Sequence, residues 1–421
     1  MPLTLDILEM GARGDGIAEQ DGERYFVPYT LPGEVVEAEP TDKRGEGIAA
    51  ELVEVLAPSR HREKAPCAHF GVCGGCALQH WRHDVYSVWK ASLIERALKQ
   101  RGVAVPAFEP GLPGAPGERR RVDFVLRRQG KRVLAGYHER GSARVVDVGT
   151  CVIARPTLTA LLEPLRATLV DVLPDGAAAD AVANETDGGV DVLIRPHKRL
   201  DLSIERRQAL ANLAERADLA RLSWGDRANP EPIVMRRPPV LVFAEVIVEP
   251  PPGAFLQATK RGELAMREAV NAWVGDAPKL ADLFAGVGSL SLGRPGRLSL
   301  FESDLSSVAA VDAAARKIGG NRVTAERRDL FRNPLLAKEL NAFDAVVLDP
   351  PRAGAAAQVA ELARSKVKRV VYASCDPGSF ARDARVLQDA AYRMDKLKVI
   401  DQFLWSGHVE SISLFVAASA P

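Results

Sequence analysis

The chain has 421 residues, of which 47% are hydrophobic and 26% are charged, and its formal net charge is +1. This is the composition of an ordinary globular protein, and its length predicts two or three domains, while the near-neutral charge argues against a polycationic protein that packages nucleic acid. No stretch has the roughly 18 apolar residues that a membrane helix requires, and the N-terminus lacks the profile of a secretion signal, so we expect a cytoplasmic protein.

Residues 1–57 predict a small β-barrel. Four short runs, LTLDILEM, ERYFVPYT, EVVEAEP and AAELVEVLA, have the composition of strands, and glycine-rich turns separate them. Strands at such short spacing are typical of the oligonucleotide-binding (OB) barrel. We expect this unit to end near Pro58.

Residues 58–250 predict a mixed α+β domain. It opens on a cysteine-rich loop, and the apolar residues of 85–102 then recur at helical spacing. A Pro/Gly-rich stretch follows at 108–118, and a second amphipathic helix is predicted at 206–218. Three consecutive prolines in EVIVEPPPGAFLQ mark the end of this domain.

A basic segment at 118–132 predicts a surface that faces phosphates. Only Glu118 and Asp123 balance its seven cations, and this imbalance favours phosphate binding over an ordinary solvated hairpin. The cations are Arg119, Arg120, Arg121, Arg127, Arg128, Lys131 and Arg132.

From residue 251 onward, helices alternate with apolar strands, which predicts a parallel sheet covered by helices. Gly286 and Gly288 form a Gly-x-Gly turn directly after one strand, and the next strand ends in Glu302, an acid placed to accept hydrogen bonds from ribose hydroxyls. Because the third glycine of a dinucleotide fingerprint is missing, an adenosyl cofactor such as S-adenosylmethionine fits better than NAD. Asp329 follows a third short run, where it either approaches the adenine or caps a helix, and the pattern leaves both interpretations open.

Two further strand ends carry reactive groups. Asp349 begins an Asp-Pro-Pro-Arg turn that indicates an active-site wall, and Cys375 ends the next strand at the same edge of the sheet. A thiol beside a methyl donor suggests attack on C6 of a pyrimidine, which makes C5 nucleophilic. Glu410, which stands beside His408, is then the base for the C5 proton. A buried structural cysteine and a surface glutamate are the alternative interpretations.

The identity of the residue after the proline pair points to the pyrimidine. Cytosine-C5 RNA enzymes have a similar layout but carry a cysteine directly after the proline pair. Here Arg352 occupies that position. Uracil is therefore the favoured target.

The other four cysteines, Cys67, Cys73, Cys76 and Cys151, predict a metal site, since cysteines stay reduced in the cytoplasm. Four thiolates suit zinc or an iron–sulfur cluster. The Cys-x5-Cys-x2-Cys spacing with a distant fourth cysteine is not a common zinc-ribbon pattern. The residues alone leave both metals open.

Taken together, these motifs resemble those of the RNA uracil-5-methyltransferase family over essentially the whole chain. They are GDGIA…FVPYTLPGE, CAHFGVCGGC, GSARVVDVGTC, FLQ, DLFAGVGS, DPPR, SCDP and HVES. The resemblance implies a multidomain α/β protein with an OB-like barrel of the TRAM type that binds RNA at 1–57. It further implies a central α+β domain with an iron–sulfur cluster at 58–250, and a Rossmann-like, S-adenosylmethionine-dependent methyltransferase domain at 251–421.

The resemblance also implies a role for each site residue. Cys375 is the nucleophile and Glu410 the general base. The cofactor residues are Gln257, Phe284, Glu302 and Asp349, with Gly286 and Gly288 shaping the loop and Asp329 on the adenine side. Cys67, Cys73, Cys76 and Cys151 bind a [4Fe–4S] cluster.

The expected product is 5-methyluridine in structured RNA, with 23S ribosomal RNA favoured over uridine 54 of transfer RNA. A non-catalytic, redox-responsive RNA-binding protein is the second hypothesis. We expect a monomer with no membrane or DNA partner. Two departures from the family stand out: Ser289 replaces an asparagine, and the segment before Glu302 is short, which predicts a truncated first helix of the cofactor fold.

Overall fold

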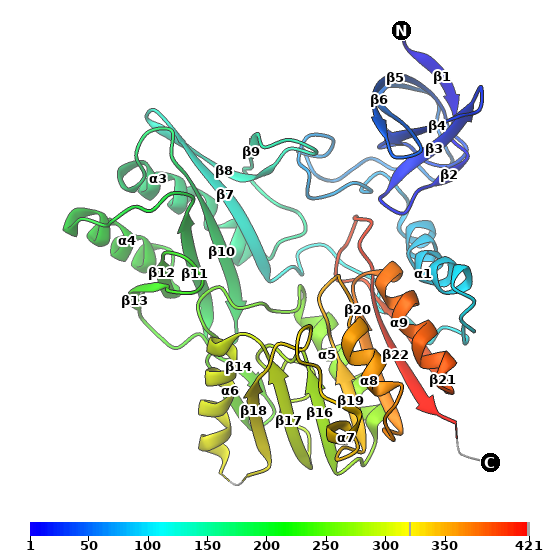
Figure 1. The fold of residues 1–421 in the computed structure, drawn as a ribbon. Coiled ribbons are helices and arrows are strands. Elements are labelled where there is room, and N and C mark those ends of the chain that lie inside the picture. The colour runs from blue at the N-terminus through cyan, green and yellow to red at the C-terminus, as the bar shows by residue number, and fades with distance from the viewer. Residues whose placement is uncertain (320, 419–421) are drawn as a thin grey trace.

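The computed structural model describes residues 1–319 and 321–418. It contains three large β-sheets, built from successive parts of the chain (Figure 1). Within the described residues, no helix combines the length and apolar character needed to cross a membrane.

The N-terminal part is all-β, as the sequence predicts. Its six strands have the order β1-β5-β6-β4-β3-β2 and curl around a small core that includes Leu5, Val27 and Val36 (Figure 1). They are β1 (Leu3–Asp6), β2 (Glu9–Met10), β3 (Asp15–Gln20), β4 (Glu23–Pro28), β5 (Val35–Arg44) and β6 (Gly47–Ala57). The assignment of this sheet to the TRAM type stays a prediction.

The central part is a seven-stranded sheet of order β13-β12-β11-β10-β7-β8-β9. Helices α3 and α4 share its core, and Ser203 caps α4 by accepting a hydrogen bond from the Arg206 amide. The strands are β7 (Arg121–Gln129), β8 (Arg132–His138), β9 (Val145–Asp147), β10 (Ala178–Thr186), β11 (Gly189–Pro196), β12 (Leu219–Trp224) and β13 (Glu231–Met235). The helices are α2 (Pro156–Thr159), α3 (Leu162–Val172) and α4 (Ile204–Arg216).

The C-terminal part is the predicted parallel sheet, of order β18-β17-β16-β19-β20-β22-β21. Five neighbouring strands are parallel, and β22 runs antiparallel to both β20 and β21. The strands are β16 (Lys279–Leu283), β17 (Arg297–Glu302), β18 (Val323–Arg327), β19 (Ala345–Leu348), β20 (Arg369–Ser374), β21 (Tyr392–Ile400) and β22 (Glu410–Ala417). The helices are α5 (Lys260–Val274), α6 (Leu305–Ile318), α7 (Ala337–Leu340), α8 (Ala356–Leu362) and α9 (Pro377–Asp389).

The connection between β16 and β17 holds turns instead of a helix in the described chain, which agrees with the predicted truncation. Arg267 of α5 fastens these turns by donating to the carbonyl oxygens of Ser289 at 2.6 Å and Leu292 at 2.5 Å. Gly288 has φ +79°, and a Cβ there would lie 2.4 Å from the Leu292 side chain. Only glycine fits this position.

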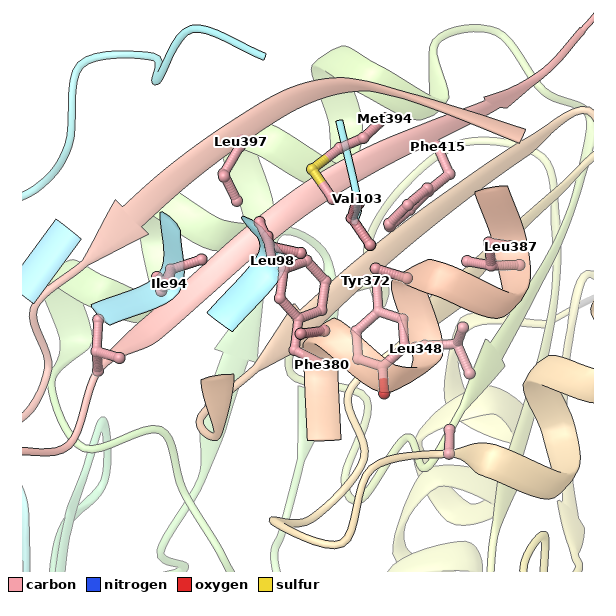
Figure 2. Packing of buried hydrophobic residues seen from close by; sticks show 14 of the residues in the cluster. Ile94, Leu98, Val103, Leu348, Tyr372, Phe380, Leu387, Met394, Leu397 and Phe415 are labelled. Atoms are coloured by element: carbon pink, nitrogen blue, oxygen red, sulfur yellow. The ribbon is translucent and has the colours of Figure 1, made fainter. Parts of the chain in front are cut away.

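Two segments before residue 251 pack on the C-terminal sheet. Helix α1 (His83–Gln100) contacts α9, and Figure 2 shows its Ile94 and Leu98 in the same apolar cluster as Leu397 of β21. The hairpin of β14 (Leu241–Phe243) and β15 (Val246–Val248) joins the core on the other side, next to α6. The core of the C-terminal sheet therefore extends beyond the 251–421 segment.

Candidate active site

A cavity of about 470 Å³ lies at the carboxyl ends of the parallel strands. Ligands bind at this edge in open α/β sheets. The cavity brings together most of the residues that the sequence singled out: Gln257, Phe284, Gly286, Glu302, Asp349, Cys375 and Glu410. Gly288 and Asp329 are not among the lining residues.

The turn after β16 contains two residues with positive φ, Phe284 and Gly286, and both line the cavity. Phe284 has φ +61°, a left-handed conformation that is rare outside glycine, and its ring packs 5.3 Å from the ring of Phe331. Gly286 also has a positive φ, and no atom lies within 4 Å of where its Cβ would be. The backbone at Gly286 is thus free for close approach by a ligand.

Glu302 ends β17 and fixes the two loops beside it. Its carboxylate accepts hydrogen bonds from the Gly286 amide at 3.0 Å and from the Asp304 amide at 2.8 Å. A carboxylate has about four acceptor positions. Glu302 therefore retains capacity to accept from ligand hydroxyls.

Asp329 lies at a turn outside the cavity. Its carboxylate accepts from the amides of Phe331 and Arg332, so it caps this turn. Of the two interpretations left open by the sequence, this geometry favours capping, although of a turn instead of a helix. It is the neighbouring Phe331 that lines the cavity.

Sequence reasoning missed Asp282, which is fully buried in the middle of β16 and lines the cavity. The Ser291 hydroxyl donates to it. Burial raises the pKa of Asp282 to about 7, and the nearby Asp349 and Glu302 add to this rise. A carboxyl within an apolar strand is the signal that identifies it, because such groups are seldom buried without a role.

Asp349 and Glu410 form a pair of neighbouring carboxyls, of which Glu410 is buried and Asp349 is half-buried. Asp349 follows β19 and accepts a hydrogen bond from the Gln257 side-chain amide at 2.8 Å. Glu410 begins β22, is 4% exposed, and has no hydrogen-bond partner for Oε1. Burial raises the pKa of both carboxyls, and Asp349 raises that of Glu410 further. The hydrogen bond from Gln257 stabilises the charged form of Asp349, and Glu410 has no such bond to its Oε1. Glu410 is therefore the more basic of the two carboxylates.

Cys375 follows the last residue of β20, and the register sets it across from Glu410. Ser374 pairs with Ser411, which leaves Cys375 and Glu410 as the next residues on the two antiparallel strands. Burial raises the pKa of the Cys375 thiol to about 12, with Glu410 and Asp349 adding to the rise and Arg352 opposing it. The thiol is therefore protonated in the free protein.

Cys375 also lines a second cavity, of about 800 Å³, between the N-terminal sheet, α1 and α9. Four arginines line this groove: Arg13, Arg96, Arg140 and Arg352. Arg140 pairs with Asp15, and Arg352 donates to the His408 ring. The thiol thus lies between the cofactor-sized cavity and a groove whose cations suit a phosphate backbone.

The other four cysteines line a third cavity, of about 270 Å³. Burial raises the pKa of Cys73, and that of Cys76 to about 12, so both hold their protons without a metal. Among the described residues, no three His, Cys, Asp or Glu side chains are close enough to share one metal ion. Four thiols around one cavity fit the donor set of an iron–sulfur cluster, whose four sulfur ligands lie farther apart than those of a single zinc ion.

The predicted phosphate-facing segment needs one correction. Arg120 is buried, forms an ion pair with Glu263, and donates to the backbone oxygen of Gln257 at 3.1 Å. A buried guanidinium fully engaged in this way cannot meet phosphate. Arg127, Lys131 and Arg132 are exposed near the tip of the β7–β8 hairpin.

Comparisons with known proteins identify relatives of this chain. Residues 304–417 match the family model described as tRNA (Uracil-5-)-methyltransferase. An uncharacterized RNA methyltransferase of Brucella suis biovar 1 (strain 1330) is 40% identical over 97% of each chain. The 23S rRNA (uracil(1939)-C(5))-methyltransferase RlmD of Pectobacterium atrosepticum is 30% identical, over 98% of this chain and 93% of that protein.

Among solved structures, the Pyrococcus abyssi tRNA (uracil-54, C5)-methyltransferase in complex with S-adenosyl-L-homocysteine has a similar fold. Its TM-score is 0.76 at 21% identity, and the match covers 98% of this chain and 99% of that one.

Proposed function

The chain belongs to the family of S-adenosylmethionine-dependent RNA (uracil-5-)-methyltransferases, and we propose that it methylates C5 of a uridine in 23S ribosomal RNA through a covalent adduct between Cys375 and C6 of the base. The position of Cys375, between the cofactor-sized cavity and the arginine-lined groove, carries the proposal. A uridine turned out of the groove meets the thiol from one side and the methyl donor from the other.

The first step activates C5. Cys375 loses its proton to solvent, and the thiolate attacks C6 of uracil while the electron pair of the C5=C6 bond moves toward O4. S-adenosylmethionine supplies an electrophilic methyl group in the cavity. C5 attacks this methyl carbon, and the sulfonium departs as the neutral thioether S-adenosylhomocysteine.

The second step restores the aromatic base. The ionised Glu410 removes the proton that remains on C5. The electron pair of that C–H bond reforms C5=C6 and expels the Cys375 thiolate. The location of Glu410 across from the thiol and its raised pKa both support this role, because a more basic carboxylate takes the proton more readily.

The choice of 23S ribosomal RNA rests on the Pectobacterium relative, which acts on 23S rRNA and aligns along almost the whole chain. The Pyrococcus abyssi transfer RNA enzyme shares the fold at 21% identity, and this likeness carries no argument about the target. Uridine 54 of transfer RNA is therefore the alternative.

We also propose that Cys67, Cys73, Cys76 and Cys151 hold a [4Fe–4S] cluster with a structural role. Arg119 and Arg121 line the same cavity, and their charges offset that of an anionic cluster. The cluster would tie the loop at 67–76 to the segment around 151. Anaerobically purified protein should contain about four iron atoms per chain, and Cys76→Ser should lose them; one zinc and no iron would contradict the proposal.

The test of the activity uses RNA that contains 5-fluorouridine. Fluorine cannot leave C5 as a proton would, so wild-type protein with methyl donor should accumulate a complex with RNA that resists SDS. Cys375→Ala should form none. Parallel reactions with 23S fragments and with transfer RNA identify the target, and the absence of a wild-type complex with either RNA would refute the mechanism.

A further inference from the structure

Gln402 lies in the loop between β21 and β22 and is 3% exposed. It carries no charge and does not line the 470 Å³ cavity. A buried amide needs hydrogen-bond partners, and Gln402 has one on each side. Its Oε1 accepts from the Thr259 amide at 3.2 Å, and its Nε2 donates to Oε1 of Gln257 at 2.9 Å.

These contacts orient two amides in series. The backbone N–H of Thr259 can only donate, so it requires the oxygen of Gln402 on its side. The NH₂ group of Gln402 then faces Gln257, which must present its own oxygen. The NH₂ group of Gln257 is left to donate to Asp349, and it does so at 2.8 Å. The Thr259 amide at one end of this series and the Asp349 carboxylate at the other thereby require the same orientation of Gln257.

Gln402 packs closely against the first turn of α5. At Gly262, in the first turn of α5, a Cβ would lie 2.6 Å from Cγ of Gln402. Thr259 caps the same helix by accepting from the Gly262 amide. The backbone of Gln257 is held separately, by Arg120. Gln257 is thus fixed at its backbone by one residue and at its side chain by another.

We propose that Gln402 is a positioning residue for the methyl-donor site, which it serves by holding Gln257 in the orientation that donates to Asp349. This inference rests on the proposed function. Without Gln402, the Gln257 side chain loses the contact that holds its oxygen, and the amide can swing away from the position in which it donates to the Asp349 carboxylate. The donor that faces the cofactor cavity is then lost, while the cavity walls remain.

Two variants of Gln402 test the proposal in the full-length protein. Gln402→Met keeps the volume and removes both hydrogen bonds, and Gln402→Glu keeps the bond from Thr259 but cannot donate to Gln257 when ionised. Calorimetric titration with S-adenosylhomocysteine should show at least about tenfold weaker binding for each variant. The KM for S-adenosylmethionine should rise, and the KM for RNA should stay as in wild type.

Gln358 provides the matched control. It is also a fully buried glutamine with two hydrogen bonds, both to the backbone of Leu335, and it is absent from the cavity lining. Gln358→Met should lower the melting temperature without changing the dissociation constant of S-adenosylhomocysteine. This pair of variants separates loss of packing from loss of positioning.

A double-mutant cycle shows whether Gln402 acts through Gln257. In a Gln257→Leu background, Gln402→Met should have no further effect on cofactor binding, whereas independent effects would multiply. The proposal would be overturned if either Gln402 variant bound S-adenosylhomocysteine as tightly as wild type. It would also be overturned if the effects of Gln257→Leu and Gln402→Met on the dissociation constant multiplied in the double variant. If Gln402→Met does not fold, Gln402→Glu carries the test. Failure of wild-type protein to bind S-adenosylhomocysteine would instead refute the proposed function.

Discussion

Cys375 and Glu410 directly continue the Ser374–Ser411 pair, the last registered pair of β20 and β22. Because the two strands are antiparallel, the thiol and the carboxyl emerge at the same edge of the sheet and face the same cavity. Their relative placement is therefore set by backbone pairing, and the charge of Glu410 helps to raise the pKa of the Cys375 thiol.

Replacing Glu410 should trap the reaction after methyl transfer. In Glu410→Gln no carboxylate removes the C5 proton, so the methylated adduct cannot release Cys375, and turnover should fall about 10²- to 10⁴-fold. With unmodified RNA and S-adenosylmethionine, this variant should form a complex that persists on a denaturing gel. The double variant Glu410→Gln/Cys375→Ala should form none; a complex in it would show that another nucleophile attacks.

The rate should rise with pH in the range 7 to 9. The pKa of the Cys375 thiol is raised to about 12, so the thiolate fraction grows up to tenfold with each pH unit below that value. The raised pKa of Glu410 acts in the same direction. Measured kcat/KM with RNA should follow this rise, and Arg352→Gln should move the profile to higher pH, since Arg352 lowers the thiol pKa. A flat profile would contradict the assignment.

Asp282 should make the cofactor-free protein less stable at high pH. Its pKa rises from 3.8 to about 7 on folding, so its contribution to stability is complete below pH 4 and is lost as the pH rises to about 7. Asp282→Asn keeps an acceptor for Ser291 and does not ionise. In urea unfolding, the free energy of unfolding of Asp282→Asn relative to that of wild type should increase by about 2–3 kcal/mol between pH 5 and pH 8. An equal difference in unfolding free energy between variant and wild type at both pH values would show that Asp282 does not titrate in this way.

Lys90 of α1 and Asp401 form a buried ion pair. Removing one partner of this pair should lower the free energy of unfolding more than removing both charges. Lys90 also donates to the Phe403 carbonyl, so it anchors the loop that leads to Glu410. Lys90→Met should lower the unfolding free energy by about 3–5 kcal/mol, because it leaves a buried charge unpaired. Adding Asp401→Asn should recover part of this loss.

An exposed pair serves as the control for that measurement. Arg385 and Asp389 of α9 form an i,i+4 ion pair with side chains 46% and 57% exposed. Arg385→Met should change the unfolding free energy by less than about 1 kcal/mol. A loss as large as that of Lys90→Met would show that burial is not the cause.

The gathering of several candidate residues at one site could be predicted because each follows an apolar run that ends at one edge of a parallel sheet. Gly286, Asp349 and Cys375 are all found in this way, and the structure gathers them around one cavity. The orientation of Gln257 could not be predicted, because it depends on Gln402, which comes 145 residues later in the chain. Hydrogen bonds between distant loops have no period or spacing that a sequence reveals.

The sequence also did not reveal what buries two other elements, the Arg120 side chain and helix α1. Arg120 reads as one of seven surface cations, yet its partner Glu263 lies in a helix that no local pattern connects to it. Helix α1 shows an apolar face at 85–102, and this pattern predicts a helix without telling which sheet it covers. Its actual partner is the C-terminal sheet.

The packing of α1 bears on how this enzyme can be divided. The three prolines at 250–252 suggest a natural cutting point, and a fragment from residue 251 onward would keep every strand of the C-terminal sheet. It would also lose Ile94 and Leu98, and with them the cover over Leu397 and Phe380. Such a fragment would expose an apolar surface in water and aggregate. Residues 251–421 are continuous in sequence, but they do not form an independently folding domain. A minimal catalytic version of this chain therefore has to retain α1.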